Sequence, residues 1–192
     1  MYLGDPQKEH PNSWYINANY IDGPYLQKER IIATQGPKKE TYHSFWRMVY
    51  LKNVSLIFML CGTEEKGQPK CHKYWPRTDV EWELDPLLTL SQSNEESLVA
   101  DQTVMRTFRL SPSEEGIKQG LETREVRQIH YTGWPDHGIP DEKGIAAFDL
   151  MLDEAKSFLE EKESEKVVVH CSAGVGRTGT FIAMLHLLGT IE

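Results

Sequence analysis

The sequence predicts an α/β fold of the α+β type, in which helices cover both faces of a mixed, twisted central sheet. Several strand-like segments follow one another in the middle of the 192-residue chain. A long amphipathic stretch comes after them, and a short β-branched run near the end leads into an apolar segment. Consecutive strands do not fit a strict alternation of strand and helix, so the sheet is expected to be mixed.

The strands are predicted from apolar composition and from alternation. Val54 to Cys61 has the length and composition of a buried strand. Val167 to His170 is β-branched and is predicted to be buried on both faces. The other strand candidates are Arg30 to Thr34, the alternating segment of Val104, Arg106 and Phe108, and Glu122 to Tyr131, which carries polar residues on one face.

Three helices are predicted from apolar residues at helical spacing. The first is expected to begin after Thr41 as N-cap, and its apolar residues are Tyr42, Phe45, Trp46, Val49 and Tyr50. The second runs from Gly144 to Glu163, and its inner side is predicted to contain Ile145, Phe148, Leu152, Ala155 and Leu159. The third, Thr178 to Leu188, is apolar nearly all round and is predicted to be a central, buried helix.

Composition excludes several classes of partner. The net charge of −8, from 29 acidic and 21 basic residues, argues against nucleic acid or an anionic membrane as the main partner. Three cysteines at irregular spacing indicate reduced thiols and a cytoplasmic location. No signal peptide or membrane-spanning segment is recognised, so no membrane contact by this segment is expected. The sequence does not indicate an oligomeric state.

The segment His170-Cys-Ser-Ala-Gly-Val-Gly-Arg-Thr-Gly179 is the strongest functional signal. It predicts a strand, a tight loop and the start of a helix, whose backbone N–H groups converge on one anion-binding hollow. Arg177 adds a planar fork that suits two phosphate oxygens. Cys171 lies at the rim of this hollow, where a thiolate would be favoured. The alternative is a buried cysteine before an ordinary glycine-rich turn.

Two further segments carry candidate chemistry. Trp134-Pro-Asp-His-Gly138 places a carboxyl, Asp136, on a loop with hinge residues, although Pro-Asp is also a common turn pair. Glu64 to Cys71 has the composition of a solvated turn. Cys71 and His72 lack a second ligand pair at zinc-like spacing, so no metal is predicted, and Cys61 is predicted to be a core residue.

The segment around Cys171 resembles the signature loop of the protein tyrosine phosphatases, His-Cys-Ser-Ala-Gly-x-Gly-Arg-Ser/Thr-Gly, and matches it throughout. Trp134-Pro-Asp resembles the general-acid loop of that family, and Glu65 to Cys71 before Tyr74-Trp-Pro76 resembles a third family loop. The chain also contains Tyr15-Ile-Asn-Ala-Asn19 and Ala33-Thr-Gln-Gly-Pro37, which match two structural motifs of the family.

The resemblance implies a tyrosine phosphatase fold and a role for each matching residue. Cys171 would attack phosphorus, Asp136 would protonate the leaving phenol, and Arg177 would hold phosphate oxygens. The loop residues that would bind the substrate with Arg177 are Ser172, Ala173, Gly174, Val175 and Gly176. The supporting residues would be His170, Thr178 and Trp134, with Glu65 paired to Arg177 and Lys70 near the acid loop.

The implied function is hydrolysis of phosphotyrosine in proteins through a phosphocysteine intermediate, without a metal or other cofactor. The alternatives are a phosphotyrosine-binding module with impaired turnover and, more weakly, a phosphatase for phosphoserine or lipids. The resemblance covers essentially all of residues 1–192 but not the whole family domain. The expected partial domain lacks the upstream tyrosine loop that deepens the pocket and the downstream glutamine loop that positions water, so its stability and full turnover are in doubt.

Overall fold

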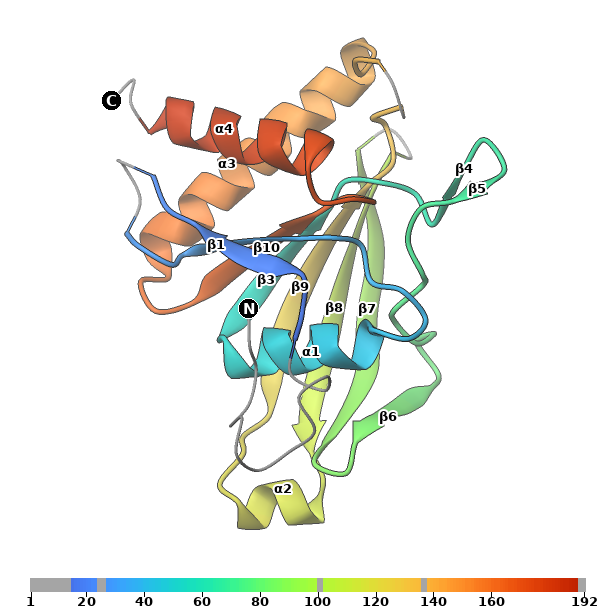
Figure 1. The fold of residues 1–192 in the computed structure, drawn as a ribbon, viewed down its shortest axis with the longest axis vertical. Coiled ribbons are helices and arrows are strands. Elements are labelled where there is room, and N and C mark those ends of the chain that lie inside the picture. Colours follow the sequence, from blue (N-terminus) through green and yellow to red (C-terminus); the bar gives the residue numbers. More distant parts are fainter. Residues whose placement is uncertain (1–14, 24–26, 100–101, 136–137, 190–192) are drawn as a thin grey trace.

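A computed structural model describes residues 15–23, 27–99, 102–135 and 138–189, and it contains one mixed sheet of eight strands in the order β1-β2-β10-β3-β9-β8-β7-β6 (Figure 1). The four neighbours β2, β10, β3 and β9 are parallel, and the pairs on either side are antiparallel. The predicted mixed sheet is therefore confirmed. The strands are β1 Ala18–Ile21, β2 Ile31–Thr34, β3 Val54–Met59, β6 Glu81–Asp85, β7 Leu88–Val99, β8 Thr103–Pro112, β9 Arg124–Tyr131 and β10 Lys166–His170.

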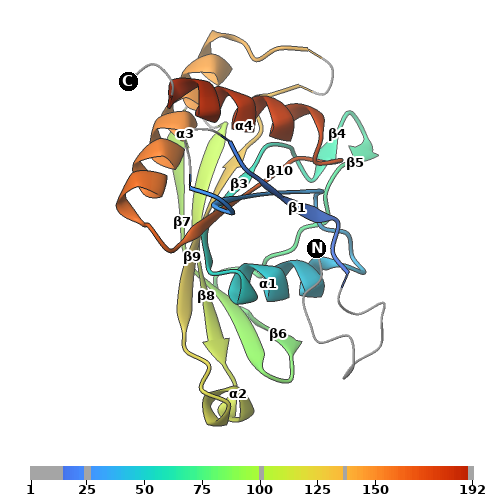
Figure 2. The same cartoon turned by 60° about the vertical axis from the view of Figure 1, so that its left-hand side comes forward.

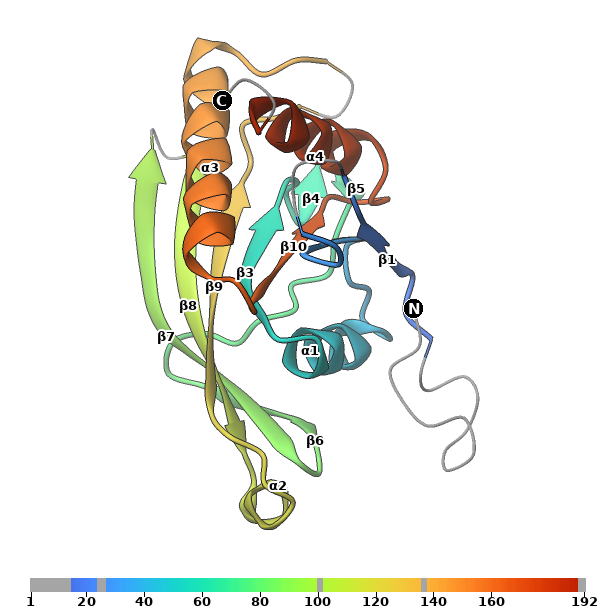
Figure 3. The ribbon, with the colours of Figure 1, turned by 90° about the vertical axis from the view of Figure 1, so that its left-hand side faces the viewer.

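Helices cover both faces of this sheet (Figures 2 and 3). On one side α3 (Glu142–Glu161) and α4 (Gly176–Leu188) pack together, while α1 (Tyr42–Leu51) lies on the other. The short α2 (Glu114–Lys118) follows the far end of β8. Asp141 caps α3, because its Oδ1 accepts a hydrogen bond of 2.8 Å from the backbone N–H of Gly144.

Aromatic side chains fill the space on each side of the sheet. Phe58 of β3 packs on Phe181 of α4, with ring centroids 4.8 Å apart. On the opposite face Trp46 of α1 packs edge-on against Phe108 of β8 at 5.3 Å. Full burial of such a side chain contributes about 2–3 kcal/mol, so these contacts fix the positions of both helices relative to the strands.

Three details differ from the sequence-based expectations. Ile145 is 48% exposed because it lies at the edge of the inward-facing stripe of α3, in the first turn. Helix α4 buries only one side, which contains Phe181, Ile182 and Leu185, whereas Leu187 is 55% exposed; the prediction of a central, buried helix was wrong. Thr41 precedes α1, but its hydroxyl accepts from the N–H of Lys38 rather than from the helix.

The sheet brings the predicted site residues to one edge. Because β10, β3 and β9 are parallel neighbours, their carboxyl ends lie side by side. The segments that leave these ends contain Cys171, the β4–β5 hairpin (Glu64–Glu65 and Gln68–Pro69) and Trp134. Among the described helices, none is long and apolar enough to cross a membrane.

Candidate active site

The loop between β10 and α4 requires glycine at one position. Gly174 has a φ of +76°, and a Cβ atom there would lie 2.4 Å from the backbone oxygen of Thr34. Any other residue would therefore clash with β2 as well as strain the backbone. The loop is also tied to its neighbours, since Gly36 N–H donates to the Ser172 carbonyl at 2.9 Å and Ser172 Oγ donates to the Lys70 carbonyl at 2.8 Å.

The thiol of Cys171 lies inside this loop and is only 4% exposed. Burial by itself would raise its pKa, but hydrogen bonds from the Thr178 side chain and from the backbone N–H groups of Thr178, Gly174 and Val175 lower it overall. The buried Thr178 hydroxyl has no other hydrogen-bond partner among the described residues, and its effect on the thiol is to lower the pKa of Cys171. The loop therefore favours a thiolate at Cys171.

A tight hairpin positions the partner of Arg177. Strands β4 and β5 are joined by Lys66 and Gly67, both with positive φ, which is the pattern of a type I′ turn. Glu65, at the end of β4, accepts two hydrogen bonds from the Arg177 guanidinium, 2.7 Å from Nη1 to Oε1 and 3.3 Å from Nη2 to Oε2. The two side chains are 14% and 9% exposed, so this bidentate ion pair is largely shielded from water.

Arg177 also contacts the segment that contains the predicted acid. Its Nη1 donates to the Trp134 carbonyl at 3.1 Å, and the Trp134 ring packs edge-on against Phe148 of α3 at 5.3 Å. Trp134 Nε1 donates to the Gly138 carbonyl at 3.2 Å and so closes the loop at its base. Asp136 lies outside the described residues, and its position in the site is not assigned.

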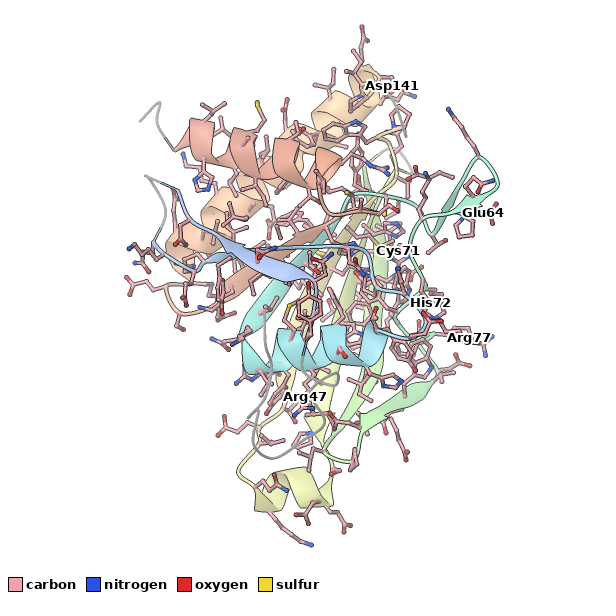
Figure 4. All side chains as sticks on the ribbon, in the orientation of Figure 1. Arg47, Glu64, Cys71, His72, Arg77 and Asp141 are labelled. Atoms are coloured by element: carbon pink, nitrogen blue, oxygen red, sulfur yellow. The ribbon has the colours of Figure 1, made fainter. Side chains whose placement is uncertain are left out.

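A cavity of about 560 Å³ opens where these segments meet. Its wall contains the predicted residues Lys70, Trp134, Cys171, Ser172, Ala173, Gly176 and Arg177, together with Pro135, Gly138 and Thr180. The side-chain view shows Cys71 and His72 one after the other on the segment that leaves the hairpin carrying Glu64 (Figure 4). A partly shielded thiolate and a fixed guanidinium in one cavity can bind a phosphoryl group and attack it.

His170 lies behind the thiol rather than in the cavity. It is fully buried, and its Nδ1 donates to the Cys171 carbonyl at 3.0 Å while its Nε2 is 2.8 Å from the hydroxyl of Tyr74. Burial lowers the pKa of His170 to about 4, so the ring is neutral at pH 7. Tyr74 and its next partner Gln128 were missed in the sequence, although polar residues on one face of the 122–131 segment were visible there.

The remaining cysteines are free thiols in the core. Cys61 is 1% exposed, and its pKa is raised by a hydrogen bond with Cys71 and by burial. Within the described parts of the chain, no cluster of three His, Cys, Asp or Glu side chains could hold a metal ion.

Comparison with known proteins identifies similar sequences over nearly the whole chain. The family model described as "Protein-tyrosine phosphatase" matches residues 2–192. The chain is 40% identical to human "Receptor-type tyrosine-protein phosphatase eta" over 184 residues, and 42% identical to chicken "Receptor-type tyrosine-protein phosphatase U" over 192 residues. These matches cover 95% and 99% of this chain, but only 13% and 12% of the two relatives.

A solved structure has the same arrangement of elements. It is described as "Structural basis of PTPN18 fingerprint on distinct HER2 tyrosine phosphorylation sites", and it is similar to this chain with a TM-score of 0.83 and 31% sequence identity. The match covers 99% of this chain and 62% of that one.

Proposed function

Because this chain belongs to the protein-tyrosine phosphatase family, a family of enzymes, we propose that it hydrolyses phosphotyrosine in proteins through a phosphocysteine intermediate. The observation that carries the proposal is a cavity whose wall contains both the Cys171 thiol and the Arg177 guanidinium. The pKa of the thiol is lowered, and the guanidinium is fixed by Glu65. We further propose that residues 1–192 are part of a tyrosine phosphatase domain, and that phosphotyrosine-containing proteins are its partners.

In the first step, the thiolate of Cys171 attacks phosphorus as the bond from phosphorus to the phenolic oxygen breaks. Arg177 and the N–H groups of the loop from Ser172 to Gly176 hold the nonbridging oxygens, whose charge is spread in the transition state. Asp136 gives its proton to the departing oxygen, so that tyrosine leaves as a neutral phenol. The products of this step are phosphocysteine and dephosphorylated tyrosine.

In the second step, a water molecule attacks phosphorus and the bond to the Cys171 sulfur breaks. The sulfur leaves as a thiolate, which the same hydrogen bonds stabilise, and inorganic phosphate is released. His170 takes no proton in either step, because it faces the backbone of Cys171 and not the cavity. Its proposed role is to hold the loop.

The experiment that tests this function measures phosphate release from a phosphotyrosine peptide by the full chain at pH 6–7. We expect turnover by the unmodified protein, none by Cys171→Ser, and trapping of phosphate on Cys171 detectable by mass spectrometry after acid quench. A phosphoserine peptide of the same sequence is the matched substrate control. Equal rates on both peptides would contradict tyrosine specificity, and unchanged activity of Cys171→Ser would contradict the mechanism.

A further inference from the structure

A row of polar side chains crosses three neighbouring strands on the α1 side of the sheet. Glu95 of β7 is directly opposite Arg106 of β8, which is directly opposite Gln128 of β9. Arg106 Nε donates to Glu95 Oε2 at 2.7 Å, and its Nη1 donates to Gln128 Oε1 at 3.0 Å. Arg106 is 8% exposed and Gln128 is fully buried, so the contact between them is shielded from water, whereas the Glu95 side chain is 48% exposed.

The guanidinium of Arg106 determines which group donates and which accepts in each hydrogen bond of this row. A guanidinium can only donate, so the oxygen of the Gln128 amide faces Arg106 and the NH₂ group faces Tyr74. Gln128 Nε2 accordingly donates to Tyr74 Oη at 2.7 Å. The single hydroxyl proton of Tyr74 is then directed to His170 Nε2, 2.8 Å away. Since that nitrogen accepts, the proton of the neutral ring is on Nδ1, which donates to the Cys171 carbonyl.

The same guanidinium acts on a second buried histidine. Arg106 Nη1 lies 3.2 Å from His130 Nδ1, which must accept, so His130 carries its proton on Nε2 and donates it to the Cys61 carbonyl at 2.8 Å. Burial, with the charge of Arg106, lowers the pKa of His130 to about 4. The contacts that start at Arg106 and the carbonyls of Cys171 and Cys61 thus require the same proton position on each neutral histidine, and the two tautomers are opposite.

Both histidines donate hydrogen bonds to backbone carbonyls in segments that lead into the candidate active site. Cys171 follows β10, and Cys61 comes shortly after β3 in the segment that leads to Glu65. These two strands are also joined beyond their ladder, because Leu60 N–H donates to the His170 carbonyl at 2.8 Å. The hydrogen bonds that His130 and His170 donate therefore connect this row to the two backbone segments that carry Cys171 and Glu65.

We propose that Arg106 is a positioning residue of the active site, which acts through Gln128, Tyr74 and His170 on the backbone of Cys171, and through His130 on that of Cys61. Arg106 does not line the cavity around Cys171 and is not a catalytic residue. The importance of this row for turnover rests on the proposed function of Cys171, whereas the proton positions themselves do not.

The first test requires no substitution. Long-range ¹H–¹⁵N correlation spectra of the full chain at pH 7 report which imidazole nitrogen carries the proton. We expect neutral rings for both residues, with the proton on Nδ1 in His170 and on Nε2 in His130. A proton on Nε2 of His170, or a doubly protonated ring, would overturn the proposal. Because this test uses the unmodified protein, it does not depend on whether a variant folds.

The second test reverses the hydrogen bond between residue 128 and Tyr74 by replacing the amide nitrogen of Gln128 with an oxygen. In Gln128→Glu, both carboxylate oxygens accept, so Tyr74 would donate to the new side chain and no longer to His170. We expect the His170 proton to move to Nε2, or the ring to become doubly protonated. We also expect kcat on an aryl phosphate to fall about tenfold, with KM changed less than about twofold, because His170 loses its neutral hydrogen bond from Tyr74; a tenfold change corresponds to about 1.4 kcal/mol.

Gln119→Glu is the matched control, since Gln119 is exposed at the end of α2 and lies far from the cavity. Unchanged ¹⁵N shifts and kcat in a folded Gln128→Glu protein would overturn the proposal. If that variant does not fold, Arg106→Met and Arg106→Lys decide instead. The proposal requires the His170 tautomer to be lost in the first and retained in the second. Unmodified protein with the expected tautomers but no phosphatase activity would contradict the proposed function alone.

Discussion

Glu65 holds the guanidinium of Arg177 through both carboxylate oxygens, at 2.7 and 3.3 Å, from a hairpin that is more than a hundred residues away in the sequence. Glu65 Oε1 also accepts the N–H of Gly62 at 3.0 Å, so the carboxylate itself is fixed by the backbone. Arg177 in turn donates to the Trp134 carbonyl. Three loops that leave three parallel strands are therefore joined at one side chain.

Replacing Glu65 by glutamine should weaken this junction. Glu65→Gln keeps the shape but removes the charge and one acceptor, so part of the pairing with Arg177 is lost. We expect kcat/KM for an aryl phosphate to fall about 10- to 100-fold, and the free energy of unfolding to drop by about 1–3 kcal/mol. Steady-state kinetics and urea denaturation measure the two effects.

Glu64→Gln provides the control for this substitution, because Glu64 is the exposed neighbour on the same hairpin strand. It removes the same charge one residue away, from a side chain that is exposed. If both variants lose activity equally, the loss comes from removing a negative charge near the site and not from breaking the ion pair between Glu65 and Arg177.

The lowered pKa of Cys171 predicts selective chemistry among the three thiols. We expect iodoacetate to alkylate Cys171 at mildly acidic pH, well below the pKa of a free thiol at about 8.5. Cys61 should stay unmodified, since its pKa is raised and its side chain is buried. Peptide mapping by mass spectrometry after alkylation between pH 5 and pH 9 identifies the modified residue at each pH.

Two further measurements make this prediction specific. Vanadate, as a phosphate analogue, should protect Cys171 by filling the cavity. Thr178→Val should move the alkylation profile to higher pH, because the hydroxyl that faces the sulfur is removed. If alkylation of Cys171 in the unmodified chain rises only near the pKa of a free thiol, the prediction that the loop stabilises a thiolate is wrong.

The sequence predicted the parts of the site that local chemistry specifies. The strand before Cys171 follows from its β-branched residues, and the tight turn follows from the glycines, of which Gly174 has a positive φ in the structure. The helix follows from the apolar residues after Thr178. The pairing of Glu65 with Arg177 was available only through the family resemblance. Composition alone indicated a solvated turn, because the sequence does not show which strands are neighbours.

Residues that depend on tertiary partners could not be predicted in the same way. Arg106 lies two residues before Phe108 on β8 and therefore on the same inward face, but an arginine at such a position is unusual because arginines are mostly exposed. It is buried because Glu95, Gln128 and His130 on adjacent strands satisfy its donors. The polar strand β7 was missed for a related reason: its middle, from Gln92 to Ser97, lacks the apolar alternation by which strands are recognised.

The two buried histidines predict how stability depends on pH. His130 and His170 have pKa values of about 4 in the folded chain, against about 6.5 when unfolded. Between these values the unfolded state binds more protons, so the free energy of unfolding rises with pH there. From pH 7 down to pH 5 each histidine should cost about 2 kcal/mol of stability.

Urea denaturation at pH 7 and pH 5 measures this slope. In His130→Gln the slope over the same interval should be roughly half, because one of the two groups is removed. The amide Nε2 can still donate to the Cys61 carbonyl, which limits other losses. Equal stability of the unmodified chain at pH 7 and pH 5 would mean that these rings are not neutral and buried in solution.

Asp136 is the proposed general acid. Its substitution should therefore lower the reaction rate by an amount that depends on the pKa of the leaving phenol. The segment on both sides, Pro135 and Gly138, lines the cavity, and Arg177 binds the Trp134 carbonyl, so the loop begins and ends at the site. In Asp136→Asn the departing oxygen receives no proton. We expect the rate of phosphocysteine formation to fall about 10²- to 10⁴-fold for a phosphotyrosine peptide.

The same variant should lose much less activity on an aryl phosphate whose phenol is strongly acidic, because that phenolate leaves without a proton. Rapid-quench measurements with a series of aryl phosphates give the dependence of rate on leaving-group pKa, which should be steep in Asp136→Asn and shallow in the unmodified chain. Asp149→Asn, at an exposed position of α3, is the matched control and should follow the unmodified protein. Similar losses for acidic and basic leaving groups would remove Asp136 from the acid role and would point to positioning of the loop instead.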